Sequence, residues 1–109
     1  MTHQYYIAIP PCFAKVIPSG DDEAQFVPVK GRKVTIESCA LHLFSHLDSG
    51  GWNISEATSG AQVCGGAITR AGAISLARDL IGKTPRSIIK KDIANHIERY
   101  GRSPWRAEA

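Results

Sequence analysis

The stretch GGWNISEATSGAQVCGGAIT, residues 50–69, decides how this chain folds. Trp52 and Ile54 alternate with Asn53 and Ser55, which is the two-residue period of a β-strand. A turn-forming segment, residues 58–60, separates this run from a second short apolar run. We therefore predict strands over residues 52–57 and 61–65, with the glycines supplying turn conformations that need a positive φ.

The same stretch also contains Gly60-x4-Gly65 ahead of a predicted helix, which is the start of a phosphate-binding loop. Such a loop continues with Lys and then Ser or Thr, which contact the phosphates and magnesium. Gly66 and Ala67 occupy those two positions, and the chain has no GxGxxG pattern. The spacing therefore argues against a nucleotide-binding loop here.

Two helices are predicted after this stretch. Thr69 is placed as the N-cap of the first, which runs to about Ile81 and ends at Gly82 in a left-handed conformation. Thr84 is placed as the cap of the second helix, with Pro85 at its first position and Gly101 after its end. The expected apolar faces are Ala73, Ile74, Ala77, Leu80 and Ile81 on the first, and Ile89, Ile93, His96, Ile97 and Tyr100 on the second.

The residues before Gly50 are also expected to be mainly β. Residues 4–9 read as an edge strand that ends at two prolines, and residues 18–25 as a loop. Residues 26–37 are predicted to form a hairpin that turns at Lys30-Gly31-Arg32. Residues 40–48 fit a strand or a helix, and the turn and strand that follow favour a strand.

These elements predict an α+β fold: a small antiparallel β-sheet, hairpin plus meander, followed by two C-terminal α-helices packed on one face. Residues 1–109 form a single domain, mainly β over 1–68 and helical over 69–101, with a tail over 102–109 that Trp105 pins. Apolar residues make up 43% and charged residues 21% of the chain. We expect a cytoplasmic protein without a membrane span, since no long apolar run or signal peptide is visible.

Candidate catalytic groups are few. The cysteines Cys12, Cys39 and Cys64 are odd in number and form no CxxC motif, so we expect small buried side chains and no disulfide framework. His42 and His46 could share a metal only if their segment were helical, because four residues of strand separate them by about 13 Å. We expect no enzyme, metal or cofactor; a small metal- or Cys/His-dependent enzyme using His42, His46 and Cys64 stays the second alternative.

Positive charge is concentrated near the C-terminus. The net charge is +3, and residues 78–106 carry eight Lys or Arg against three acids. Such a region suits an acidic protein surface or, as the alternative, DNA or RNA. The candidate partner-binding residues are the basic Arg86, Lys90, Lys91, Arg99 and Arg102, together with Asn53, Ser55 and Gln62 on the polar sheet face.

Over residues 41–82 the order of strand, turn, strand and helix, with Trp52, Glu56 and Thr69 at its landmarks, resembles ethylene-response-type DNA-binding domains and the arm-binding domains of phage recombinases. The resemblance implies a sheet inserted into the major groove, which needs basic residues on its face. This chain has no Lys or Arg between Ala40 and Ile68, so its sheet lacks the charge that supplies much of DNA affinity.

The chain as a whole is similar to the small accessory proteins of phages and plasmids. The resemblance implies a non-catalytic module that binds and inhibits or modulates a host protein complex, such as a defence system. We therefore expect a host protein or protein complex as the partner, and no cofactor.

Overall fold

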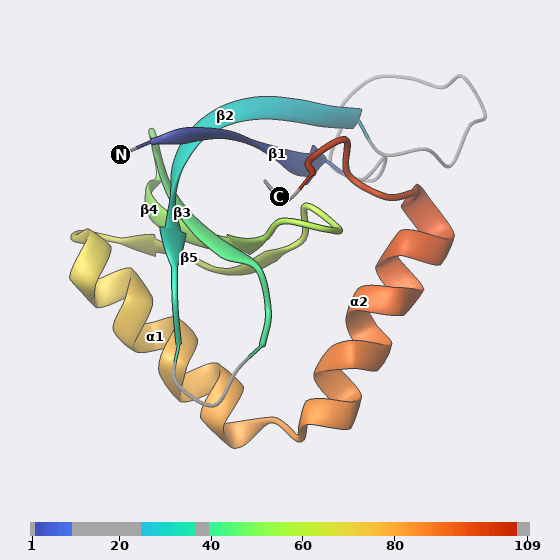
Figure 1. Ribbon diagram of the computed structural model, residues 1–109. Coiled ribbons are helices and arrows are strands. Elements are labelled where there is room, and N and C mark those ends of the chain that lie inside the picture. The colour runs from blue at the N-terminus through green and yellow to red at the C-terminus, as the bar shows by residue number, and fades with distance from the viewer. Residues whose placement is uncertain (1, 10–24, 37–39, 107–109) are drawn as a thin grey trace.

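The computed structural model describes residues 2–9, 25–36 and 40–106. It contains a five-stranded antiparallel sheet in the order β1-β2-β3-β4-β5, followed by two helices (Figure 1). The strands are β1 (His3–Ile9), β2 (Gln25–Val34), β3 (Leu43–Asp48), β4 (Gly51–Glu56) and β5 (Gln62–Ala67), and the helices are α1 (Arg70–Lys83) and α2 (Arg86–Tyr100). The predicted α+β fold class is confirmed.

Residues 43–48 form a strand, so the strand interpretation of this ambiguous segment is confirmed. The predicted hairpin at Lys30-Gly31-Arg32 is wrong, because β2 runs through these residues without a turn. Up to Gly31 the strand pairs with β1, and from Arg32 it pairs with β3. A Cβ at Gly31 would come within 2.9 Å of the rings of Tyr5 and Phe44, so close packing explains this glycine.

The sheet is rolled so that its first strand reaches the turn after β4. The Ala8 amide donates to the Gly60 carbonyl oxygen at 2.9 Å, and the Ser103 amide donates to the Thr58 carbonyl oxygen at 3.0 Å. Gly60 has a φ of 73° and leaves no room for a side chain beside Ala8. The turn at residues 57–60 therefore holds both β1 and the C-terminal tail.

The two faces of the rolled sheet carry separate cores. Val34, Leu43 and Ile54 pack with Ala73 and Ala77 of α1 on the outer face. The inner face holds a smaller cluster around Tyr5, Phe44 and Ala57, against which Trp105 packs. The predicted role of Trp105 in pinning the tail is thus confirmed.

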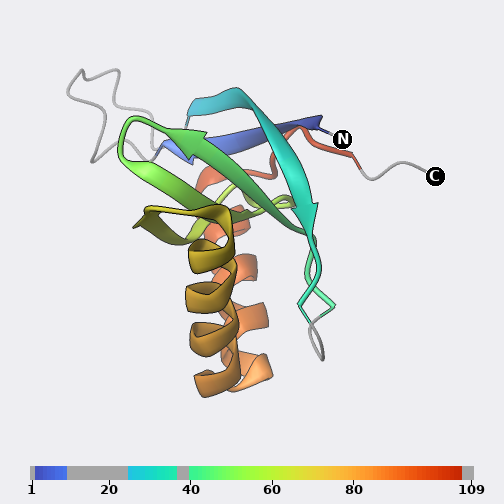
Figure 2. The same ribbon diagram turned by 90° about the vertical axis from the view of Figure 1, so that its left-hand side faces the viewer.

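Both helices extend from the same side of the sheet (Figures 1 and 2). The Thr69 hydroxyl caps α1 by accepting from the Gly72 amide, as predicted. Two predicted helix ends are wrong: α1 continues through Gly82, and Thr84 donates its hydroxyl to the Leu80 carbonyl oxygen and so closes α1. Gly101 ends α2 with a φ of 91°, as predicted. Neither helix in the described residues is long and apolar enough to cross a membrane.

Candidate functional site

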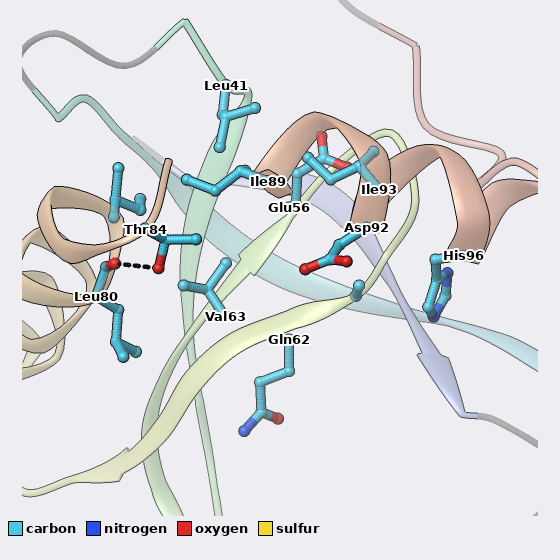
Figure 3. Close-up of a pocket in the computed structure, with 12 residues that line it drawn as sticks. Leu41, Glu56, Gln62, Val63, Leu80, Thr84, Ile89, Asp92, Ile93 and His96 are labelled. Atoms are coloured by element: carbon cyan, nitrogen blue, oxygen red, sulfur yellow. Dashed lines mark hydrogen bonds between the residues drawn. The ribbon is translucent and has the colours of Figure 1, made fainter. Parts of the chain in front are cut away.

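A groove of about 350 Å³ lies between the end of α1, the facing side of α2 and β5. Its walls are mostly aliphatic, and Ile89 points from α2 toward the Leu41 side of the groove (Figure 3). The lining residues are Leu41, Glu56, Ala61, Gln62, Val63, Leu80, Ile81, Thr84, Ile89, Asp92, Ile93 and His96. We call this cavity the helix groove.

The helix groove exists because α2 does not close onto the sheet. The predicted face of α2 does turn inward, since Ile89, Ile93, His96, Ile97 and Tyr100 are all half-buried. No residue of α2 is buried, whereas α1 buries Ala73 and Ala77 completely. Alanine permits α1 to lie close to the strands, while α2 leaves isoleucine side chains facing open space.

A buried carboxylate lies at the floor of the helix groove. Glu56 is 3% exposed, and its two oxygens accept from the amides and the hydroxyls of Thr58 and Ser59 at 2.6–2.9 Å. These four donors satisfy the negative charge, as burial of a carboxylate requires. Glu56 therefore organises the turn that closes the sheet.

His96 of α2 contributes a polar group to the same groove. Its Nδ1 is buried and has no hydrogen-bond partner among the described residues. Burial lowers the pKa of the imidazole, and the nearby Glu56 carboxylate partly offsets this effect. A neutral His96 thus has an unsatisfied ring nitrogen at the end of an apolar groove. The helical pattern placed His96 on the apolar face but did not predict this unsatisfied nitrogen.

The polar sheet residues proposed from the sequence do not form an open face. Asn53 is buried, where it donates to Asp48 and Gly51 and accepts from the Gly66 amide. Ser55 is also buried, and its Oγ lies 3.3 Å from His46 Nε2. Because both side chains use their polar groups inside the sheet, we remove them from the partner surface. Gln62 is exposed and lines the helix groove.

The five candidate basic residues, by contrast, are all exposed. Arg86, Lys90, Lys91 and Arg99 lie on α2, and Arg102 lies just after it. The Arg99 guanidinium lies over the Tyr100 ring, 5.4 Å from its centroid. Four of these cations therefore lie on the helix that forms one wall of the groove, and the fifth lies just beyond its end.

A cationic residue that the sequence analysis did not select has a structural role. Arg70, the first residue of α1, donates from Nε to Ser45 Oγ at 2.8 Å and from Nη2 to the Lys33 carbonyl oxygen at 3.2 Å. It thus joins the start of α1 to β2 and β3. The sequence shows that Arg70 directly follows the predicted N-cap, so its side chain starts near the end of β5. A helical pattern, however, does not indicate which strands this side chain reaches.

The residues considered for catalysis are kept apart. His46 packs on the Phe44 ring, and burial lowers the pKa of its imidazole. The Cys64 thiol donates to the Ala73 carbonyl oxygen at 3.4 Å, and burial raises its pKa. His42 instead lies against Trp105. In the described part of the chain, no three His, Cys, Asp or Glu residues are placed to hold a metal ion.

Cys12 and Cys39 lie outside the described residues, as does most of the predicted loop at 18–25. Comparison with known proteins gives no match: no family model, no curated protein and no solved structure is similar to this chain. Any functional assignment therefore depends on the geometry described above.

Proposed function

We propose that this protein is a non-catalytic binding module that captures a segment of another protein in the helix groove. The observation that carries the proposal is that α2 buries none of its residues, although Ile89 and Ile93 line an apolar groove of about 350 Å³. A helix of this length gains most of its stability from packing of its apolar face. A partner side chain in the groove would supply the packing that the chain itself leaves incomplete.

The charges around α2 indicate the chemistry of the partner. Exposed cations on α2, including Lys90 and Lys91, would attract an acidic surface and speed its association. An apolar anchor flanked by acidic residues fits both the groove and its outer wall. The unsatisfied Nδ1 of His96 would form a hydrogen bond with a polar group on the same segment.

The biological setting that we propose is the cytoplasm of a bacterial cell, where the module is an accessory protein of a phage or plasmid. It would occupy and inhibit or modulate a host protein complex, such as a defence system. A small domain with an unfilled groove and exposed cations supports this proposal, since occlusion of a partner requires a surface and no catalytic group.

The test compares two substitutions on the same helix. Ile93 lines the helix groove, whereas Ile88 is 47% exposed and lies outside it. Tagged wild-type, Ile93→Arg and Ile88→Arg proteins would be used to purify partners from a host lysate, after circular dichroism shows that each is folded. We expect Ile93→Arg to lose a partner that the other two retain.

A Lys90→Glu/Lys91→Glu variant tests the charge of the proposed partner. With the purified partner, we expect slower association and a weaker salt dependence than for the wild type.

The groove itself is tested by the isoleucine pair. Equal recovery of every co-purifying protein by Ile93→Arg and Ile88→Arg would contradict the proposed groove.

A further inference from the structure

A second cavity, of about 540 Å³, lies at the open end of the rolled sheet, away from the helix groove. It is bordered by β1, by residues at the β2–β3 end of the sheet and by the C-terminal tail, with Lys33, His42, Trp105 and Arg106 among its lining residues. Its volume lies within the range of about 300–1,000 Å³ that is typical of small-molecule sites. We call this cavity the tail pocket.

Aromatic rings lead from the core into the tail pocket. Tyr5 is buried and stacks on Phe44 with ring centroids 4.2 Å apart. Trp105 lies next, nearly parallel to Tyr5 at 6.0 Å, and His42 lies 5.2 Å from Trp105. Trp105 is half-buried and His42 is exposed, so the series ends in rings that a ligand can reach.

The polar lining of the tail pocket is basic. Lys33 and Arg106 are both exposed, and none of the lining residues is acidic. The Arg106 Nη1 group donates to the carbonyl oxygens of Ser103 and Trp105, which holds the guanidinium beside the tail. Three of its five N–H donors then have no partner within the described ranges, and they are suited to an anion.

The edge of β1 adds hydrogen-bonding groups. The Ala8 amide points away from β2, toward Gly60. Because backbone groups alternate in direction along an antiparallel strand, the amide and carbonyl of Gln4 point to the same outer side. Gln4 is among the lining residues, so this outer edge of β1 borders the pocket.

Accessible rings, the outer edge of β1 and two cations without a lining acid match a planar heterocycle that carries a phosphate. We propose that the tail pocket binds a nucleoside phosphate, with the base stacked on Trp105 and His42 and the phosphate held by Lys33 and Arg106. The ligand is either a free nucleotide or one nucleotide of a single strand. This site goes beyond the proposed protein-binding function and uses a different surface.

The binding test uses the intrinsic fluorescence of Trp105. A Trp52→Phe background removes the other tryptophan of the chain, which lies in the core on the other face of the sheet. This protein would be titrated at about 50 mM salt with AMP, with UMP and with a five-nucleotide single strand. We expect saturable quenching by at least one of them, and at least about tenfold weaker binding of adenosine and of ribose 5-phosphate.

Saturation by a mononucleotide assigns a free nucleotide as a sufficient ligand, and saturation by the oligonucleotide alone assigns a single strand. No saturable binding in any arm would overturn the proposal. Equal affinity for ribose 5-phosphate would also overturn it, since the rings would then make no contribution.

A matched pair of variants separates the pocket from general charge. Lys33→Gln/Arg106→Gln and Lys90→Gln/Lys91→Gln each remove two exposed cations, but only the first pair lines the tail pocket. We expect the first to lose about tenfold or more in affinity and to reduce the salt slope for the single strand by about 1.4. The second should change affinity less than about twofold. A comparable loss in both would show nonspecific attraction and refute the site.

Discussion

The two helices are of similar length, yet only one of them belongs to the core. The α1 helix has a side-chain N-cap, two completely buried alanines and an arginine that reaches two strands. The α2 helix begins at Arg86, has Pro85 as an N-cap without a side-chain hydrogen bond, and buries no residue. The difference shows that an apolar stripe predicts which face of a helix turns inward, but not how closely that face packs.

The largest expected difference between the helices is in amide hydrogen exchange. The α1 amides should exchange only through global unfolding, which for a domain costs about 5 kcal/mol or more. The α2 amides should exchange through local opening, because few buried contacts hold this helix. We expect protection factors at least about a hundredfold higher in the middle of α1 than in α2, measured by NMR. Equal protection would show that α2 unfolds only with the rest of the domain.

An identical substitution placed in each helix sharpens the comparison. Ala77 of α1 is completely buried, whereas Ala94 of α2 is exposed. Ala77→Leu should reduce the free energy of unfolding by about 1–3 kcal/mol through overpacking. Ala94→Leu should change it by less than about 0.5 kcal/mol. Urea denaturation measures both, and a comparable loss for Ala94→Leu would place α2 in the core.

The helix caps provide a smaller effect. Thr69→Ala removes the hydroxyl that accepts from the Gly72 amide and should cost about 1 kcal/mol. Pro85→Ser introduces a capping hydroxyl at the start of α2, which has none. We expect this change to increase helicity by circular dichroism while shifting the global unfolding free energy by less than about 0.5 kcal/mol. A global gain as large as the Thr69→Ala loss would show that the two helices fold as one unit.

The smallest expected effect is the pH dependence of stability. Burial lowers the pKa values of His46 in the sheet and His96 in α2. The unfolded state therefore binds protons first as the pH falls through about 6.5, and the free energy of unfolding falls with it. We expect less than about 1 kcal/mol per histidine between pH 7 and pH 5, after allowance for the partial exposure of His96.

His46→Gln and His96→Gln distinguish the sheet from the helix. Each substitution should reduce the fall in the free energy of unfolding between pH 7 and pH 5, measured by urea denaturation. Only His96→Gln should change how much helicity α2 loses as the pH falls. A pH profile unchanged by either substitution would show that neither imidazole is buried as neutral histidine.

The order of strands and helices could be predicted from the sequence because local patterns specify it. Alternation around Ile54, the cap at Thr69 and the glycine at position 101 each depend on neighbouring residues, and the structure confirms all three. The prediction places Gly31 in a turn because alternating apolar residues flank it on both sides, but glycine also occurs where backbones and rings approach closely. Only the tertiary contact with Tyr5 and Phe44 separates these two uses.

The site was less accessible to prediction from the sequence. Asn53 and Ser55 were expected on a polar face, but the rolling of the sheet encloses that face. His96 lies near Glu56, and Trp105 lies against His42, although each pair comes from segments that are distant in the sequence. Patterns with periods of two or 3.6 residues describe single elements and contain no information on such encounters.

The turn at residues 57–60 has a consequence for how the protein is made. It receives a hydrogen bond from Ala8 near the N-terminus and another from Ser103 near the C-terminus. Contacts between residues so far apart form late, because the intervening chain must first be ordered. During synthesis the hydrogen bond from Ser103 to Thr58 can form only after residue 103 has left the ribosome, so a nascent chain lacks the contact between the tail and this turn until then.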